Sequence, residues 1–278
     1  MNTRGFQRHV VLNGRLLDAG EARISPLGEG FMSGLGLFET IRIMHGRLVF
    51  FQDHFERLHR SAGELGLPFT TSSDELRARC ERCVVANRLG EGNLKIVVFQ
   101  DTDGPGELIV TREKTYLFEH YKRGFELKTF SGGQREGKIF GLKTVNYLGN
   151  LQARQAVQAA GCDEALFIDS AGMILEGATS NVFVVKGGEV ITPPLDGRIL
   201  PGIARNRVLQ RLQGSRAREC AVPAQLLTEA DEVFVTNALL GVMPVAAINL
   251  QRYDLNNNPI TQSLMEAYRK LQLQSVDG

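Results

Sequence analysis

The stretch EALFIDSAGMILEGATSNVFVVKGGEVITPP, residues 164–194, decides what kind of fold the chain adopts. It contains four apolar runs, and glycine-containing turns divide each half, at Gly172 and at Gly187-Gly188. Short apolar runs separated by such turns predict β-hairpins. Glu176 and several small polar residues stand between the two halves. The stretch therefore predicts two successive hairpins with a carboxylate at their junction.

Helices are predicted on both sides of these hairpins. Upstream, alanine and valine recur at helical spacing from Ala153 to Ala160, and Gly161 ends the pattern. Downstream, we expect helices in GIARNRVLQRL (202–212), PAQLLTEA (223–230) and ITQSLMEAYRKLQ (260–272), and a strand in DEVFVTNA (231–238). This half of the chain is predicted to be a hairpin-rich domain.

The N-terminal half predicts hairpins together with two helices. Apolar runs surround Asn13-Gly14 and His45-Gly46, FQDHFERLHRSAGELG (51–66) has a helical period, and Ser72 with Glu75 forms a capping box. Further strands are expected in LKIVVFQ (94–100) and GELIVTREK (106–114). We predict an α+β fold with a small α+β domain over 1–117, a linker over 118–126 and a larger domain over 127–278.

Composition limits the class of partner. The 278 residues include 32 basic and 31 acidic side chains, a net charge of +1, so no basic surface for nucleic acid or an anionic membrane is expected. No signal peptide or membrane-spanning apolar run is evident, which predicts a cytoplasmic protein acting on a small molecule. Cys80 and Cys83 are expected on one helix face, in neither a disulfide nor a metal site.

Two nucleotide-binding motifs are excluded by spacing. The glycines of GEGFMSGLG (28–36) lack the G-x-G-x-x-G spacing and precede a predicted hairpin instead of a helix, which argues against a dinucleotide site. No G-x-x-x-x-G-K-[ST] sequence occurs, so a P-loop is absent.

Two charged residues stand in unusually apolar surroundings. Lys143 in GLKTVNYLGN (141–150) is either a half-buried surface lysine or a nucleophile, which requires a lowered pKa. Glu176 either closes an exposed turn or lies inside, where it should face a cation such as a protonated pyridine nitrogen.

Several other residues could bind a phosphate, although each also has an ordinary structural explanation. Pro201 and Gly202 precede a predicted helix, so the backbone N–H groups of Ile203 and Ala204 could face an anion. Arg57 shares a helix face with His54 and Leu58, and is either a surface side chain or a forked phosphate ligand. Thr236, Asn237 and Ala238 at a strand end offer further donors.

Taken in order, six segments resemble the class IV family of pyridoxal-phosphate enzymes, fold type IV, which includes branched-chain aminotransferases, D-amino-acid aminotransferases and aminodeoxychorismate lyases. The resemblance covers roughly residues 28–250 and rests on GLGLFETIRI (34–43), HFERLHRSA (54–62), GLKTVNYLGN, LEGATSNVF (175–183), LPGIAR (200–205) and TNALLGVMPV (236–245). It implies a small N-terminal domain, a larger barrel-like C-terminal domain and a homodimer.

The resemblance also implies a role for each candidate residue. Lys143 would form the internal aldimine with pyridoxal 5'-phosphate and then act as a general base, while Glu176 would face the ring nitrogen. Tyr147 would contact the phenolic oxygen of the ring. The phosphate ligands would be Arg57, Ile203, Ala204, Thr236, Asn237 and Ala238.

Two reactions remain open. TNALLGVMPV resembles the segment of aminodeoxychorismate lyases, which release pyruvate and 4-aminobenzoate for the folate pathway, and the alternative is a class IV aminotransferase. Many relatives have an arginine where Gln100 stands, at the expected substrate site. Either another cation such as Arg42 or Arg135 holds the substrate carboxylate, or the substrate is an amine or an unusual amino acid. Phe38 and Glu39 are expected to line the substrate pocket. A non-catalytic homologue is disfavoured because it would have no need of Lys143, Glu176 and Arg57 together.

Overall fold

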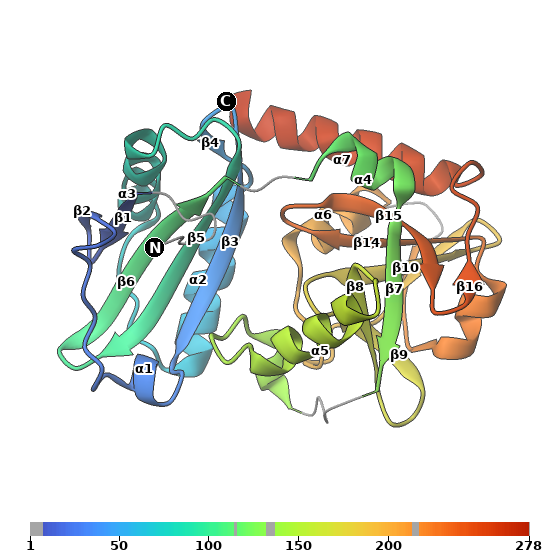
Figure 1. Cartoon of the computed structure of the whole chain (residues 1–278), viewed down its shortest axis with the longest axis horizontal. Helices are drawn as coiled ribbons and strands as arrows, with labels where there is room; N and C mark the ends of the chain where they lie inside the picture. The colour runs from blue at the N-terminus through green and yellow to red at the C-terminus, as the bar shows by residue number, and fades with distance from the viewer. Residues whose placement is uncertain (1–7, 114–115, 132–136, 213–216, 278) are drawn as a thin grey trace. The chain divides into compact units, whose positions relative to one another are not determined.

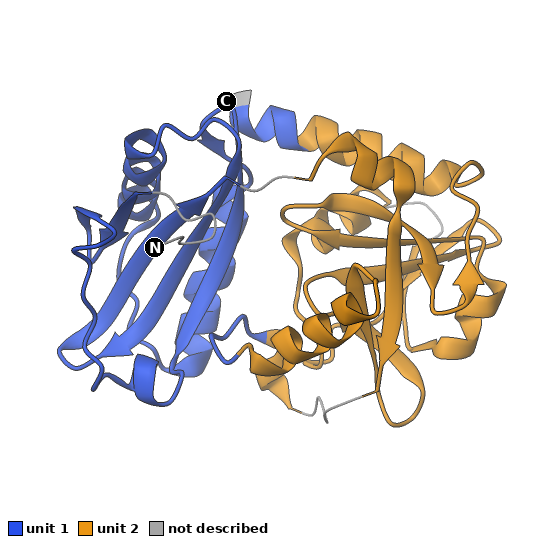
Figure 2. Cartoon of the chain, in the orientation of Figure 1, with its two compact units in different colours: residues 1–115, 142–146, 272–278 blue, residues 116–141, 147–271 orange. Residues whose placement is uncertain are grey.

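The computed structural model describes residues 8–113, 116–131, 137–212 and 217–277 (Figure 1). Its contacts divide the chain into two compact units (Figure 2). Unit 1 comprises residues 1–115, 142–146 and 272–278, and unit 2 comprises residues 116–141 and 147–271. The interval 118–126, expected as a linker, contains helix α4 (Phe118–Arg123) and the first residues of strand β7.

Unit 1 is built on a six-stranded antiparallel sheet with the strand order β2-β1-β6-β5-β3-β4. The strands are β1 (His9–Leu12), β2 (Arg15–Asp18), β3 (Gly36–Met44), β4 (Arg47–Leu48), β5 (Gly92–Asp101) and β6 (Gly104–Arg112), and the helices are α1 (Glu29–Met32), α2 (Phe51–Leu65) and α3 (Ser73–Ala86). All four expected N-terminal strand regions and both long helices are confirmed.

The two predicted hairpin turns follow from local backbone geometry. In β1–β2, Leu12 pairs with Arg15, and Asn13 and Gly14 between them have φ values of 48° and 74°. His45 and Gly46 join β3 to β4 with φ values of 52° and 74°. Two consecutive left-handed residues define the turn that matches the twist of paired strands, and glycine takes this conformation without steric cost.

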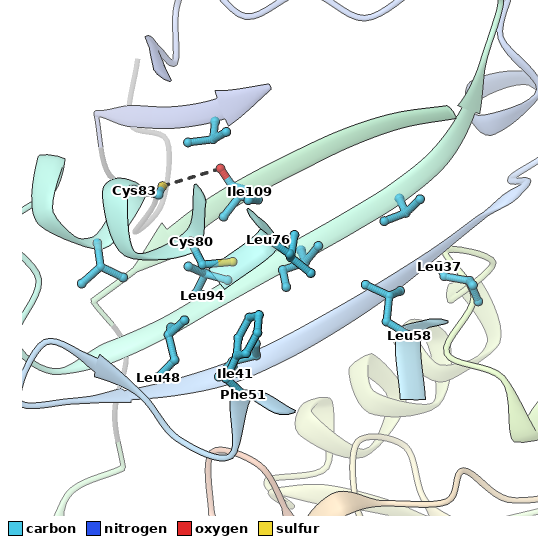
Figure 3. Packing of buried hydrophobic residues seen from close by; sticks show 14 of the residues in the cluster. Leu37, Ile41, Leu48, Phe51, Leu58, Leu76, Cys80, Cys83, Leu94 and Ile109 are labelled. Carbon is cyan, nitrogen blue, oxygen red and sulfur yellow. Dashed lines mark hydrogen bonds between the residues drawn. The ribbon is translucent and has the colours of Figure 1, made fainter. Parts of the chain in front are cut away.

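Alternation along the central strands creates the core of unit 1. Leu94, Ile96 and Val98 of β5 face the helices, and the buried positions of α2 and α3 cover them, among them Leu58, Leu76 and Cys80 (Figure 3). Full burial of a side chain such as Leu76 contributes about 1.5–3 kcal/mol. The Ser72 hydroxyl accepts a hydrogen bond from the Glu75 N–H and caps α3, as the capping box predicts.

A short segment far along the chain joins the edge of β3. The Phe38 N–H donates to the Lys143 carbonyl at 2.8 Å, and the Val145 N–H donates to the Gly36 carbonyl at 3.0 Å. Leu37 and Thr144 form an antiparallel bridge between these two bonds. Residues 142–146 therefore belong to unit 1 by their contacts, although the chain on both sides of them belongs to unit 2.

Unit 2 contains a ten-stranded mixed sheet with the order β12-β11-β10-β14-β15-β7-β8-β9-β13, and β16 pairs with β15. Its strands are β7 (Phe125–Phe130), β8 (Glu164–Ile168), β9 (Met173–Gly177), β10 (Asn181–Lys186), β11 (Glu189–Thr192), β12 (Ala217–Glu219), β13 (Val222–Pro223), β14 (Glu232–Asn237), β15 (Gly241–Ile248) and β16 (Gln251–Arg252). Strands β9 and β10 lie far apart in this order, yet the residues of both contribute to one core cluster, so the sheet curls. The four strands predicted within 164–194 are confirmed.

The helices that were predicted in unit 2 are found there except at one place. The remaining elements are the 3-10 helix η1 (Lys138–Gly141), α5 (Leu148–Ala159), α6 (Ile203–Arg211), the 3-10 helix η2 (Ala224–Glu229) and α7 (Pro259–Asp277), the last residues of which belong to unit 1. The α-helix expected over 223–230 is instead η2. η2 connects β13 to β14, and short 3-10 helices are frequent as such connectors.

In the described part of the chain, no helix is long and apolar enough to cross a membrane, and no cluster of three metal-ligating side chains occurs. Cys80 and Cys83 are unpaired thiols buried on α3. Burial raises the pKa of Cys80 well above its usual value and that of Cys83 to about 11, so both remain protonated.

Candidate active site

Strand β3 carries the first group of candidate residues, and its alternation separates two neighbours that were expected to act together. Phe38 and Glu39 are consecutive, so their side chains point to opposite faces of the sheet. Glu39 lies on the face covered by α2 and is only 1% exposed. Its carboxylate therefore faces α2. The sequence had instead predicted that Glu39 lines the substrate pocket.

Arg57 and His54 of α2 hold the Glu39 carboxylate at three points. Arg57 donates from Nε to Oε1 at 2.7 Å and from Nη2 to Oε2 at 2.6 Å. His54 Nδ1 lies 2.7 Å from Oε2. Arg57 is buried in the same cluster, as the predicted helix face with His54 and Leu58 requires.

The protonation states of this cluster follow from its charges. Burial alone would raise the pKa of Glu39, but the charge of Arg57 and the hydrogen bonds from His54 and Arg57 outweigh it and hold the pKa well below its usual range. Burial lowers the pKa of His54, and Glu39 offsets this effect only in part. The cluster at neutral pH is thus an ionised carboxylate, a guanidinium and a neutral imidazole that donates from Nδ1.

The reactive-lysine candidate, in the segment 142–146, contacts Phe38 on the opposite face of β3. Lys143 Nζ lies 4.5 Å from the centroid of the Phe38 ring, and Lys95 Nζ lies 4.1 Å from the same centroid. Burial lowers the pKa of Lys95, and the charge of Arg112 lowers it further. Two lysine side chains therefore meet one aromatic ring beside the segment 142–146.

Sequence reasoning missed Lys95, although a signal was available. Its neighbours Leu94 and Ile96 face the core, so period-2 alternation places Lys95 on the same face as Phe38. A single lysine in the apolar strand LKIVVFQ marks that face as chemically distinct. Gln100 lies further along β5, and its side-chain amide donates to the Asp101 carbonyl at 3.0 Å.

Arg42 and Arg135 were the two cations considered for binding a substrate carboxylate in place of Gln100. Arg42 lies on β3 in register with Asn93 of β5, two residues before Lys95. Arg135 lies outside the described residues. Lys95, which lies on the same face of the sheet as Phe38, is a further candidate for binding a substrate carboxylate.

In unit 2, Glu176 lies near the end of β9 and is 6% exposed, so the exposed-turn explanation is wrong. Its Oε2 accepts from the Leu200 N–H at 3.0 Å and from Asn181 Nδ2 at 3.4 Å. Asn181 also donates to the Leu200 carbonyl at 2.9 Å. These bonds fix the buried carboxylate beside the chain that leads into α6.

The start of α6 is shaped by close packing against Asn181. Gly202 is the residue before the helix, as predicted, and a Cβ placed on it would lie 2.0 Å from Asn181 Oδ1. The first N–H groups of an α-helix lack intrahelical acceptors and favour an anion. Ile203 and Ala204 supply the first two of these groups in α6, which begins within three residues of the Glu176 anchor at Leu200.

Thr236 is brought to the same place by strand register. It pairs with Asn181 across β14 and β10 and is completely buried. Within the described part of the chain, its Oγ1 has no hydrogen-bond partner. A buried hydroxyl without a partner is costly, and a ligand that hydrogen-bonds to it would offset this cost. Thr236 thus fits the phosphate of pyridoxal phosphate, with the α6 N-terminus beside it.

Asn237 and Ala238, the remaining predicted phosphate ligands, lie in a turn that follows Thr236. Asn237 Oδ1 accepts from the N–H groups of Leu239 and Leu240 at 2.9 and 2.7 Å, and Ala238 lies within that turn. Asn237 Nδ2 also donates to the Thr179 carbonyl at 3.1 Å. The Asn237 side chain therefore connects two loops, and only backbone groups of this turn are suited to a phosphate.

Tyr147 is anchored to the loop that follows Glu176. Its hydroxyl donates to the Ala178 carbonyl at 2.6 Å, and Asn150 Nδ2 donates to the same oxygen at 2.7 Å. Glu164 supports this loop from the other side by accepting hydrogen bonds from the Thr179 backbone and hydroxyl. Glu176 and Asn181 are thus joined by a hydrogen bond, Thr236 pairs with Asn181 through strand register, and Tyr147 is bonded to the loop between Glu176 and Asn181. Asn181 was not singled out from the sequence.

Comparisons with known proteins show the family and the fold of the chain. The sequence profile of the family described as amino-transferase class IV matches residues 36–248. The chain is 29% identical to the aminodeoxychorismate lyase of Bacillus subtilis over 94% of each protein, and 30% identical to the D-alanine aminotransferase of Bacillus licheniformis over 93% of this chain and 95% of the relative.

Solved structures show the same fold. A branched-chain aminotransferase from Thermoproteus uzoniensis with norvaline superposes with a TM-score of 0.87 at 28% identity, covering 97% of this chain and 96% of that one. A putative 4-amino-4-deoxychorismate lyase from Legionella pneumophila gives 0.84 at 25% identity over 91% and 97%. The chain belongs to the class IV aminotransferase family, which consists of pyridoxal-phosphate-dependent enzymes of fold type IV.

Proposed function

We propose that this enzyme binds pyridoxal 5'-phosphate through Lys143 and acts as an aminodeoxychorismate lyase, releasing 4-aminobenzoate and pyruvate. The observation that carries the cofactor assignment is the buried network of Glu176, Asn181 and Thr236 at the N-terminus of α6. It combines a fixed carboxylate with a buried hydroxyl that lacks a partner in the described residues. These are the groups that a protonated pyridine ring and its phosphate require.

The chain's own residues divide the work of binding and proton transfer. Bound pyridoxal phosphate supplies an aldehyde for the amine and a ring that accepts electron density from the substrate carbon. Glu176 would keep the proton on the ring nitrogen, and Tyr147 would contact the phenolic oxygen. The phosphate ligands would be Arg57, Thr236 and the backbone N–H groups of Ile203, Ala204 and the Asn237-Ala238 turn.

Lys143 moves the proton in this scheme. Once the substrate amine has replaced it, its Nζ removes the proton from the carbon that bears nitrogen. The Phe38 ring beside Nζ limits the directions from which water can solvate the amine. Lys95, on the same ring, supplies a positive charge for a substrate carboxylate, the role for which Gln100 lacks a charge.

The choice of reaction rests on two observations. TNALLGVMPV follows the lyase pattern, and the Bacillus subtilis lyase is similar over nearly the whole chain. The alternative is an aminotransferase, which the 30% identity to a D-alanine aminotransferase favours. Both reactions use Lys143 and Glu176, so these residues do not distinguish them.

One assay separates the two reactions. Purified enzyme loaded with pyridoxal phosphate is mixed with aminodeoxychorismate and no keto acid, and pyruvate and 4-aminobenzoate are quantified. Their formation in equal amounts supports the lyase. Turnover that depends on an added keto acid, with D-alanine or a branched-chain amino acid as donor, supports the aminotransferase. The Lys143→Ala variant is the control and should be inactive in both assays.

Two further predictions concern the environment of the enzyme. We infer a homodimer, because the resemblance to fold type IV enzymes implies one, and sedimentation measurements would test it. A cytoplasmic location is inferred from the sequence and is tested by cell fractionation.

A further inference from the structure

Glu39 occupies a position at which a carboxylate is unexpected. On β3 it stands between Leu37 and Ile41, and across the sheet it pairs with Ile96, all core residues. An ionised carboxylate in such a place is strongly unfavourable unless cations and hydrogen-bond donors compensate for it. A core residue of similar size would satisfy the packing at this position, so packing does not explain the carboxylate.

The geometry around Glu39 orients Arg57. Both carboxylate oxygens accept from the guanidinium, through Nε and Nη2, and this bidentate arrangement fixes its plane. His54, three residues earlier on the same face of α2, holds Oε2 from a second direction. The carboxylate cannot rotate without breaking one of these bonds, and the orientation of the Arg57 guanidinium is thereby set.

The net charge of the Glu39, His54 and Arg57 cluster determines how Arg57 can interact with an anion. Glu39 neutralises the guanidinium, and His54 is uncharged, so the cluster has almost no net charge. Its effect on an anion therefore depends on the direction of N–H groups more than on long-range attraction. A flexible arginine would serve long-range attraction equally well without a buried partner.

We propose that Glu39, anchored by His54, is a positioning residue that orients Arg57 toward the phosphate of pyridoxal phosphate. This inference rests on the proposed function. In it, Glu39 contacts neither substrate nor cofactor and acts only through Arg57. Removing the orienting carboxylate should weaken cofactor affinity about tenfold. This is the lower end of the loss in metal affinity that follows when a residue orienting a metal ligand is removed. The loss is confined to ligands that have the phosphate.

The test compares two aldehydes that differ only in that group. Apoenzyme is titrated with pyridoxal phosphate and with pyridoxal, and the dissociation constants are taken from the absorption change of the bound aldehyde. Glu39→Gln is expected to weaken pyridoxal phosphate about tenfold and to leave pyridoxal unchanged. Glu107→Gln is the matched control, because Glu107 is a buried carboxylate of the same unit that pairs with Arg79 at 3.0 Å.

Each outcome decides the proposal. Equal weakening of both aldehydes, or an unchanged affinity for pyridoxal phosphate, would overturn it. Should Glu39→Gln not fold, Glu39→Asp keeps the charge but withdraws the carboxylate by one methylene, and the same selective loss is expected. If the unaltered enzyme binds neither aldehyde, the proposed function itself fails, which separates the two conclusions.

Discussion

Replacing Thr236 by valine should make the enzyme without cofactor more stable and bind the cofactor less tightly. Valine has nearly the shape of threonine, so the packing against β10 is kept. The change removes a completely buried hydroxyl whose Oγ1 has no hydrogen-bond partner in the described residues. It also removes a donor that we assign to the phosphate.

The magnitudes follow from these two roles. Loss of a buried hydroxyl without a partner stabilises the apoenzyme by about 1–3 kcal/mol. For a chain of this size, 1 kcal/mol corresponds to about 2 °C or slightly more in Tm. A hydrogen bond to a charged group contributes about 1.5–3 kcal/mol, so cofactor affinity falls about 10- to 100-fold.

Thermal unfolding of apoenzyme and titration with pyridoxal phosphate measure the two effects. Thr261→Val is the matched control, because Thr261 is also completely buried in unit 2 with an Oγ1 that has no partner in the described part of the chain. It should raise Tm without changing the affinity. The reasoning is refuted if Thr236→Val lowers the Tm of the apoenzyme, or if both variants bind the cofactor like the unaltered enzyme.

Three further changes test other parts of the site. Lys95→Met should raise the KM for a carboxylate substrate about 10- to 100-fold and keep the cofactor spectrum, whereas an unchanged KM would remove Lys95 from substrate binding. Gly202→Ala should weaken cofactor binding, since its Cβ would lie 2.0 Å from Asn181 Oδ1 and displace the start of α6; unaltered affinity by titration would contradict this. The pKa of Glu39 is lower folded than its unfolded value of about 4.5, so its contribution is complete above that pH and is lost as the pH falls toward the folded value. Acid unfolding should therefore be steeper below about pH 4.5 for the unaltered enzyme than for Glu39→Gln, and parallel curves would contradict this.

Local signals predicted most of the elements. The left-handed pairs Asn13-Gly14 and His45-Gly46 fix their hairpins by themselves, so two residues in each hairpin were sufficient to place its two strands. The α-helix expected over 223–230 was wrong, because Pro223 belongs to β13 and the short connection from β13 to β14 is the 3-10 helix η2.

The site was less predictable because its residues are joined by non-local pairings. No local pattern shows that Lys143 lies against Phe38 or that Thr236 pairs with Asn181, since both depend on strand register. Glu39 is a different case. It was expected in the substrate pocket, whereas its alternation with Leu37 and Ile41 could have placed it on the core face, where a buried carboxylate requires a cation such as Arg57.

The most direct test of the central claim is to find which lysine binds the cofactor. The enzyme is loaded with pyridoxal phosphate, reduced with borohydride, digested and examined by mass spectrometry. We predict that the phosphopyridoxyl group lies on Lys143 alone. Modification of Lys95 on the same Phe38 ring, or recovery of both lysines unmodified, would contradict the account.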